Sequence, residues 1–376
     1  MTKQLRIGML GAGFIGSFHS YALSLQSLIR NPPSAVIQLA VLADLNEATR
    51  TAVQKRFGWE RTTSSWEEVV ADRAIDVFVN AGPNVLHHGP VIEALSGGKS
   101  VFCEKPLALD SVEALAMWKA AEARGAVHQA AFVYRFVPAL RYVRELIQQG
   151  AVGDVTHFRS EYLMSNYLQP GLDFSWRLDK KIAGTGTFGD LGAHHIDLAR
   201  FLVGEIAEVA AIGRTFVPQI GGQTVEVDDA FVSILQFEKG PIGVIQASRV
   251  AAGYGHSSSI RVDGTKGSLR FNVERLNEIE IAEGLDNGFR TVQVIKPEHP
   301  FSDFWWEGGV QGSHPIGWVE CFVQQMNHFI QAVLGDTRVS PLAATFEDGY
   351  RAVEIADTMV RSWKSGRREK VQFEAA

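Results

Sequence analysis

The hydrophobic and polar residues of the first 131 positions alternate between two kinds of stretch. Short, almost wholly apolar runs, typical of parallel strands buried on both faces, lie at residues 6–10, 35–43, 75–79, 100–103 and 127–131. Stretches with helical periodicity lie between them, at residues 17–30, 47–57, 86–95 and 111–124. This alternation predicts an α/β fold, a doubly wound parallel sheet.

The pattern changes after residue 131. Helices are predicted at residues 138–149 and 191–203, and strands at residues 155–162, 208–216, 229–237, 242–249, 259–262, 268–271 and 278–281. The turns at residues 238–241 and 263–267 are too short for crossover helices, and they favour antiparallel hairpins. Residues 286–318 predict a long loop before helices at 319–334 and 346–363. We therefore expect a nucleotide-binding domain at residues 1–130 and an α+β domain for substrate binding and oligomerisation at residues 131–376.

Composition and charge narrow the function classes. The chain has 376 residues, of which 46% are hydrophobic, and this excludes a disordered or fibrous protein. Its 36 Lys and Arg against 42 Asp and Glu give a net charge of -6, so neither a nucleic acid nor a membrane surface is expected as a partner. The two cysteines, Cys103 and Cys321, have no metal-ligand spacing, which indicates a reducing cytoplasm and no metal site. No signal peptide or apolar run of membrane-spanning length is apparent.

A glycine-rich run, Gly11-Ala12-Gly13-Phe14-Ile15-Gly16, connects the first strand to the first helix. Gly11 permits the tight turn, Gly13 lets the backbone approach a pyrophosphate, and Gly16 lets the helix pack against the strand. The helix N-terminus then stabilises the negative charge. The run predicts a Rossmann dinucleotide site, and Phe14 and Ile15 are counted with the glycines as cofactor-binding residues.

The second strand ends at Asp44, where a carboxylate can accept the two ribose hydroxyls of NAD. Such an anion repels the 2'-phosphate of NADP, and no Lys or Arg occurs between Asp44 and Arg50. The sequence therefore favours NAD, with NADP left open. A second interpretation makes Asp44 the N-cap of the helix at residues 47–57, and the two are compatible.

Further polar groups follow the next two strands. The fourth strand runs into Pro83-Asn84 and His87, and the fifth into Glu104-Lys105-Pro106. Ligands of an open parallel sheet bind at the carboxyl ends of its strands. A lysine facing a bound nicotinamide there could orient a substrate hydroxyl or take part in its deprotonation.

These motifs together resemble the glucose-fructose oxidoreductase, inositol dehydrogenase and MocA (Gfo/Idh/MocA) family. The resemblance rests on the glycine run, Pro83-Asn84 with His87, Glu104-Lys105-Pro106 and residues 176–204. It implies that Lys105, Asp190 and His194 form the catalytic group and that the strand-end residues bind the cofactor. No zinc site is expected, since no third ligand lies at a suitable spacing. His195 and Asp197 are expected to be structural.

Elementary chemistry agrees with these roles. Asp190 and His194 are four residues apart, a spacing that puts both on one face of a helix. Oxidation of a secondary alcohol needs a proton acceptor for the hydroxyl, and neutral histidine is suited to that task. We expect His194 to be the general base, Asp190 to orient its imidazole, and Lys105 to stabilise the developing alkoxide. Taken singly, each of these residues is more typical of a turn, a core position or a helix cap.

The substrate is expected to be a polyhydroxylated ring. The resemblance places Tyr134, Arg177 and His314 near the site, next to Lys105, Asp190 and His194, and such groups suit a pyranose or cyclitol. Residues 175–177 and 183–190 are similar to levoglucosan dehydrogenases and glucoside 3-dehydrogenases of the family. One departure is Val133, where family members often carry asparagine before the Tyr-Arg pair. Trp305, Trp306 and Trp318 could stack on a sugar or pack a core.

Three function classes remain open on the sequence. The leading one is an NAD-dependent dehydrogenase of a pyranose sugar, anhydrosugar or cyclitol. The others are a glycosidase that uses bound NAD transiently and a sensor that binds sugar and NAD without turnover. Because several strands of the second domain look apolar on both faces, we also expect its sheet to pair with another copy in a homodimer or homotetramer.

Overall fold

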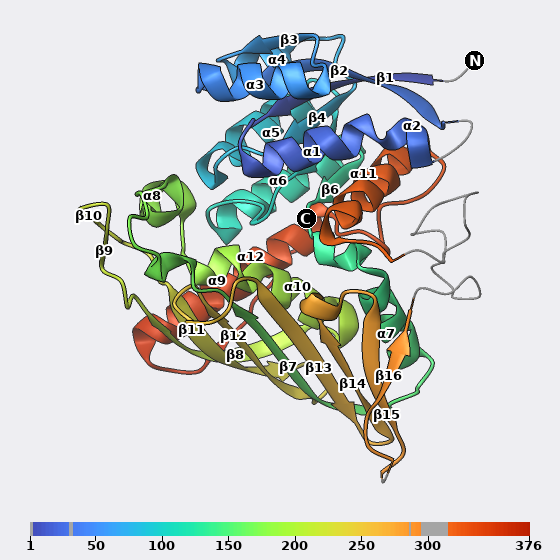
Figure 1. Ribbon diagram of the computed structural model, residues 1–376, viewed down its shortest axis with the longest axis vertical. Helices are drawn as coiled ribbons and strands as arrows, with labels where there is room; N and C mark the ends of the chain where they lie inside the picture. The colour runs from blue at the N-terminus through green and yellow to red at the C-terminus, as the bar shows by residue number, and fades with distance from the viewer. Residues whose placement is uncertain (1–2, 30–32, 286, 295–314) are drawn as a thin grey trace.

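The computed structural model describes residues 3–29, 33–285, 287–294 and 315–376. Within these residues the chain forms a six-stranded sheet, a nine-stranded sheet and a separate two-stranded ribbon. The six-stranded sheet lies at one end of the molecule, the nine-stranded sheet lies at the other, and helices occupy the space between them (Figure 1).

The six-stranded sheet is parallel throughout, which confirms the predicted N-terminal fold. Its strands are β1 (Lys3–Leu10), β2 (Ala35–Ala43), β3 (Arg61–Thr63), β4 (Val77–Asn80), β5 (Ser100–Cys103) and β6 (His128–Ala130). Their spatial order is β3-β2-β1-β4-β5-β6. The order reverses between β1 and β4, and ligands of such sheets bind at this reversal, beside the strand ends.

Helices flank this sheet, and several have the ends that the sequence indicates. They are α1 (Phe14–Ser24), α2 (Gln26–Ile29), α3 (Glu47–Phe57), α4 (Trp66–Ala71), α5 (His88–Ser96) and α6 (Ser111–Arg124). The Asp110 side chain caps α6 by accepting from the Glu113 N–H, and Gly125 ends it in the left-handed conformation. Helix α1 begins inside the glycine run, earlier than predicted, because Gly13 is already its N-cap.

The nine-stranded sheet has the order β16-β15-β14-β13-β7-β12-β11-β8-β17. Its strands are β7 (Val155–Leu163), β8 (Ile206–Arg214), β11 (Ala230–Phe237), β12 (Ile242–Ser248), β13 (Ser257–Gly264), β14 (Gly267–Asn272), β15 (Glu278–Glu283), β16 (Arg290–Gln293) and β17 (Glu369–Lys370), and the ribbon is β9 (Gln219–Ile220) with β10 (Gln223–Thr224). The predicted hairpins β11–β12 and β13–β14 are antiparallel. The central pair β12–β7 is parallel, so the sheet is largely but not wholly antiparallel.

Two sequence predictions for this half need correction. The strand predicted to reach residue 216 ends at Arg214, because the N–H groups of Phe216 and Val217 donate to the Asp229 carboxylate instead of to a neighbouring strand. The loop predicted from residue 286 contains β16, which pairs with β15. His314, Trp305 and Trp306 lie outside the described residues.

One face of the large sheet is covered by helices. The helices of this half are α7 (Pro138–Gln148), α8 (Lys180–Ala183), α9 (Thr187–Asp190), α10 (Gly192–Leu202), α11 (Trp318–Leu334) and α12 (Phe346–Ser365). Short 3-10 helices lie at η1 (Asn84–Leu86), η2 (Val133–Phe136), η3 (Asn166–Leu168), η4 (Trp176–Leu178) and η5 (Val273–Arg275). Helix α12 packs against both β8 and α6, and α11 packs against α1, so the two halves share one interior.

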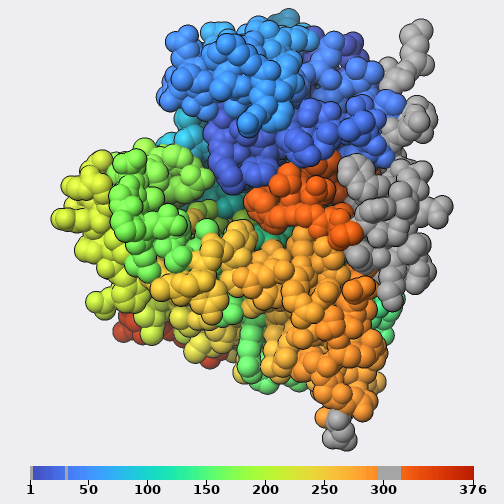
Figure 2. All heavy atoms as spheres, in the orientation of Figure 1, coloured from blue at the N-terminus to red at the C-terminus, as the bar shows by residue number. Residues whose placement is uncertain are grey.

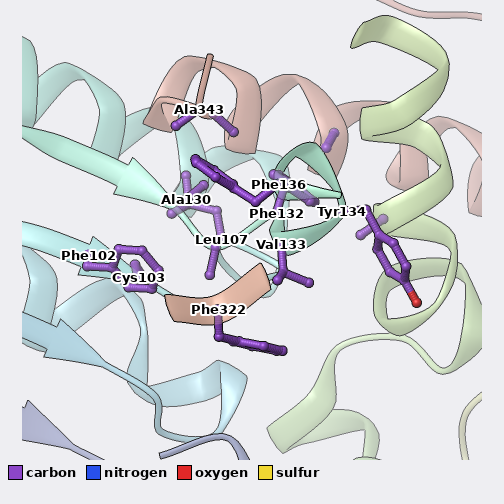
Figure 3. Close-up of a cluster of buried hydrophobic side chains, with 14 of the residues drawn as sticks. Phe102, Cys103, Leu107, Ala130, Phe132, Val133, Tyr134, Phe136, Phe322 and Ala343 are labelled. Carbon is purple, nitrogen blue, oxygen red and sulfur yellow. The ribbon is translucent and has the colours of Figure 1, made fainter. Parts of the chain in front are cut away.

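The junction between the halves is a continuous apolar core. Phe102 and Leu107 come from the N-terminal sheet and the segment after it, and they lie close to Phe132, Phe136 and Phe322 (Figure 3). Each of these side chains is at most 2% exposed. Tyr134 extends from the same region with its hydroxyl directed away from the cluster (Figure 3). The core therefore fixes the segment after β6 relative to the end of β5, where Lys105 lies.

Candidate active site

The glycine run forms a turn that only glycine fits at two positions. Gly11 has a φ of +98°, and a Cβ on it would lie 2.3 Å from the Ala81 carbonyl oxygen. A Cβ on Gly16 would lie 2.0 Å from the Gly11 carbonyl oxygen. A Cβ on Gly13 would meet no atom within 4 Å. The space beside Gly13, next to the free N–H groups that open α1, therefore suits a pyrophosphate, and these residues fit a bound NAD.

Asp44 faces this turn from the end of β2. Its Oδ2 accepts from the Ala12 N–H at 2.7 Å and its Oδ1 from the Asn46 N–H at 2.8 Å. The cap of α3 is Asn46, whose side chain accepts from the Thr49 N–H at 3.0 Å. The interpretation of Asp44 as the N-cap is therefore wrong, because the helix starts two residues later than that role requires. Asp44 is positioned to accept ribose hydroxyls beside the turn.

The residues after β4 bind other loops of the protein. The Asn84 amide donates to the Ala183 carbonyl at 2.9 Å. The two ring nitrogens of His87 lie 2.8 Å from the Pro106 carbonyl and 3.1 Å from the Gly82 carbonyl. Burial lowers the pKa of His87, so its ring is neutral and donates to one of these carbonyls at a time. His87 thus joins the loops after β4 and β5, Asn84 joins its loop to the end of α8, and Pro83 is partly exposed.

Glu104 connects the cofactor helix to the next strand end. Its Oε1 lies 2.7 Å from His19 Nε2 in α1, and its Oε2 accepts from the Lys105 N–H at 3.0 Å. Burial raises the pKa of Glu104, but the hydrogen bonds and charges of His19 and Lys105 together outweigh that effect and lower the pKa overall. The carboxylate is therefore ionised and fixes the backbone that carries the Lys105 side chain.

Lys105 and Asp190 meet across the two halves of the chain. Lys105 Nζ donates to Asp190 Oδ1 at 2.6 Å and to the Asp190 carbonyl at 3.0 Å. Arg249 donates to Asp190 Oδ2, and Arg177 Nε lies 3.8 Å from the same oxygen. Burial raises the pKa of Asp190, but the charges of Lys105, Arg249 and Arg177 outweigh it and hold the pKa well below its usual range. Asp190 is thus an anion surrounded by cations.

His194 lies beside this cluster on α10, with its ring against those of Tyr134 and Tyr162. The ring centroids of His194 and Tyr134 are 5.0 Å apart and nearly perpendicular. Burial, followed by the charge of Lys105, lowers the pKa of His194 well below its ordinary value, so the ring is neutral at neutral pH. Its Nδ1 is buried and has no hydrogen-bond partner among the described residues.

The structure corrects one expected contact within the catalytic group. Both Asp190 oxygens are bonded to cations, and among the described residues no hydrogen bond joins Asp190 to His194. The reason is local: α9 ends at Asp190 and α10 begins at Gly192, so the two side chains belong to separate helices that meet at Leu191. Asp190 therefore orients Lys105, and it acts on His194 only through its charge.

The remaining predicted residues have distinct positions. Tyr134 is 1% exposed, and its hydroxyl lies 3.0 Å from His256 Nε2. Arg177, with a side chain 41% exposed, lies over the Trp176 ring at 4.3 Å. Phe14, which is 69% exposed, borders the entrance to the cofactor turn. Figure 2 shows a recess on this face between the N-terminal residues, the residues around α8 and the start of α11.

Two residues expected to be structural have structural partners. His195 is fully buried and its Nε2 lies 3.3 Å from Ser258 Oγ. Asp197 forms a two-pronged ion pair with Arg135, at 2.8 Å to Nε and 2.6 Å to Nη2. The Arg135 side chain is 4% exposed and Asp197 1%. This pair holds α10, and with it His194, against η2.

Sequence reasoning missed Arg249, Tyr162 and His256. Arg249 follows the end of β12, Tyr162 lies on β7 and His256 precedes β13. None of them belongs to a recognisable motif, and only the pairing of β7 with β12 and β13 brings them together. The one available signal was the period of two along the predicted strand, which puts Tyr162 on the same face as Phe158.

Two protein-family models match the two halves of the chain. Residues 5–132 match the model of the oxidoreductase family with an NAD-binding Rossmann fold, and residues 140–270 match the GFO/IDH/MocA C-terminal domain. This chain belongs to the Gfo/Idh/MocA family. No helix among the described residues is long and apolar enough to cross a membrane. No group of three His, Cys, Asp or Glu side chains in the same residues could hold a metal ion.

Relatives within the Gfo/Idh/MocA family cover the whole chain. Levoglucosan dehydrogenase of Pseudarthrobacter phenanthrenivorans is 35% identical over 382 residues, 96% of each chain. Inositol 2-dehydrogenase of Rhizobium meliloti is 30% identical, over 95% of this chain and 96% of its own. The solved structure of a levoglucosan dehydrogenase in complex with NADH and levoglucosan superposes with a TM-score of 0.92, at 35% identity, over 98% of this chain and 100% of the other. This chain is thus an NAD-binding oxidoreductase.

Proposed function

We propose that this protein is an NAD-dependent dehydrogenase that oxidises a secondary hydroxyl of a pyranose sugar, anhydrosugar or cyclitol. The observation that carries the proposal is the contact of Lys105 Nζ with Asp190 at 2.6 Å, beside the neutral His194. Lys105 follows β5 of the cofactor-binding sheet, so its ammonium group lies on the side of the sheet where the nicotinamide is expected.

Each side chain has a separate task in the proposed reaction. NAD, when bound, supplies the hydride acceptor. Lys105 donates to the substrate oxygen and stabilises the negative charge that develops there. His194 accepts the hydroxyl proton on a ring nitrogen. Asp190 holds the lysine in place, and its negative charge stabilises the imidazolium that His194 becomes.

The substrate class is supported by the polar groups around this centre and by the relatives. Arg177 Nε lies 3.8 Å from Asp190, and the Tyr162 ring lies 6.2 Å from that of His194, with its hydroxyl 3.2 Å from His256 Nε2. A polyhydroxylated ring needs several such groups converging from different elements. Two relatives are named levoglucosan dehydrogenase and inositol 2-dehydrogenase, which act on an anhydrosugar and a cyclitol according to those names.

The experiment is a measurement of NADH absorbance with NAD and a panel of levoglucosan, inositols, glucose, glucosides and xylose. We expect a signal with at least one ring polyol, abolished in His194→Gln and Lys105→Met. The matched control is His157→Gln, which changes an exposed histidine on β7. If NAD binds but no compound of the panel gives NADH, the result would contradict the proposal and favour the glycosidase or the sensor.

We also propose that the face of the large sheet that none of the described helices covers binds a second copy of this chain. Four apolar side chains on three adjacent strands are exposed there: Ile212 at 76%, Val232 at 47%, Ile234 at 60% and Ile242 at 49%. Arg and Glu side chains lie on neighbouring strands of the same face, so two copies can pair by symmetry. Sedimentation should show a dimer or tetramer that Ile234→Lys dissociates. A wild-type protein that is monomeric at micromolar concentration would contradict this proposal.

A further inference from the structure

A cation lies next to the residue that is expected to exclude NADP. Arg50 comes from the first turns of α3, and its Nη1 donates to the Asp44 carbonyl at 3.1 Å and to the Leu45 carbonyl at 3.2 Å. These carbonyls follow β2 directly, so the guanidinium lies at the strand end where the adenosine ribose is held in this fold. The five residues that separate Asp44 from Arg50 in sequence are folded into one loop and a helical turn.

The charge of Arg50 is not neutralised by a neighbouring carboxylate. Among the described residues no ion pair includes Arg50, whereas Arg6 and Arg61 on the adjacent strands pair with Glu60 and Asp72, each at 2.9 Å. Arg50 Nε and Nη2 take no part in its two bonds to the loop carbonyls. A guanidinium presents its N–H groups as a planar fork that matches a phosphate.

The charge of the Asp44 carboxylate is partly compensated by main-chain hydrogen bonds. Both of its oxygens accept main-chain N–H groups, from Ala12 and Asn46. The N-terminus of α3, an eleven-residue helix, opens in the same loop and adds its positive end. Repulsion of a 2'-phosphate by Asp44 is therefore opposed by a guanidinium and by a helix terminus at the same strand end.

We propose that Arg50 forms a subsite for the 2'-phosphate of NADP, so that the protein binds NADP(H) as well as NAD(H), with NAD(H) preferred. The preference follows from Asp44, which accepts ribose hydroxyls that NADP lacks at the 2' position. The tolerance follows from Arg50, which binds the phosphate through the edge of its guanidinium that faces away from the loop. This inference concerns cofactor choice and is independent of the sugar.

The test is equilibrium titration of the purified full-length protein with NADH and with NADPH, followed by nicotinamide fluorescence. Arg50→Gln should weaken NADPH binding by about tenfold or more and change NADH binding by less than about twofold. Arg50→Lys should retain part of the NADPH affinity, because the charge remains but the fork is lost. Arg56→Gln is the matched control, since it removes an exposed arginine of the same helix that lies over the Phe57 ring.

Two results would overturn the proposal. One is a wild-type protein that shows no saturable NADPH binding. The other is an equal loss of NADH and NADPH affinity in Arg50→Gln, which would make Arg50 a support of the loop and nothing more. The titration contains no sugar, so a failure to bind NADPH would not bear on the proposed dehydrogenase activity. Likewise, a failure to find the sugar substrate would not bear on the NADPH titration.

Discussion

The glycine turn and the Lys105–Asp190 cluster, which we propose as the cofactor-binding and catalytic centres, are built over very different lengths of chain. The turn lies within residues 11–16, and its steric demands are met by a strand, a turn and a helix in succession. The cluster joins residues 85 and 59 positions apart, from both sheets. In the turn, the role of each glycine follows from its place in the motif. In the cluster, sequence located Lys105, Asp190 and His194 but did not fix which side chain bonds which.

The largest expected effect comes from breaking the cluster. Lys105→Met removes the cation that Asp190 holds while leaving the glycine turn intact. We expect kcat to fall by about a thousandfold, because the developing alkoxide loses its donor. The dissociation constant of NADH should change little, and fluorescence titration checks this. A variant with kcat near the wild-type value would show that the cluster is not the catalytic centre.

Substitution in the glycine turn should instead affect stability and NADH binding. In Gly16→Ala the new methyl group would lie 2.0 Å from the Gly11 carbonyl oxygen, so we expect the free energy of unfolding to fall by about 3 kcal/mol and NADH binding to be lost. Gly13→Ala is the matched control. It meets no protein atom within 4 Å and should keep its thermal stability while it loses NADH affinity. Equal melting temperatures for the two variants would contradict the steric account of the turn.

A smaller effect separates the two interpretations of the loop after β2. Asn46→Ala removes the side-chain cap of α3 and should lower the free energy of unfolding by about 1 kcal/mol, without changing NADH affinity. Asp44→Ala should weaken NADH binding by about tenfold, since it removes the acceptor of the ribose hydroxyls. Chemical denaturation of both variants measures the free energy of unfolding, and fluorescence titration measures their NADH affinity. The reverse pattern would restore Asp44 as the helix cap.

The smallest effect is expected from pH. Burial and the Lys105 charge hold the pKa of His194 well below 6.5, so the ring stays neutral as the pH falls through that value. We expect kcat/KM to change by less than about twofold between about pH 7.5 and about pH 6. The unfolded chain binds this proton more readily, so the same shift lowers stability as the pH falls below about 6.5. An acid limb centred near pH 6.5 that Asp190→Asn moves would instead indicate a direct Asp190–His194 pair.

Much of the fold was predictable because its signals are short in range. Apolar runs gave the buried strands, and the turns at residues 238–241 and 263–267 predicted two of the hairpins, which the structure confirms. The parallel pair β7–β12 was not predictable, because three α-helices and four strands separate the two strands in sequence and no local pattern specifies that neighbour. Strand β16 has four residues of weak pattern in a segment that otherwise looks like loop.

The sequence by itself determined the dinucleotide turn, the strand ends that carry Asp44 and Lys105, and the short segment that carries Asp190 and His194. Each depends on steric or periodic requirements that act within a few residues. Only the tertiary structure decided that Asp190 bonds Lys105 and Arg249, that His87 bonds the loop at Pro106, that Glu104 bonds His19 of α1, and that Arg50 lies beside Asp44. The physical reason is that ion pairs form between charges close in space, and that closeness is set by how the two sheets and their helices pack.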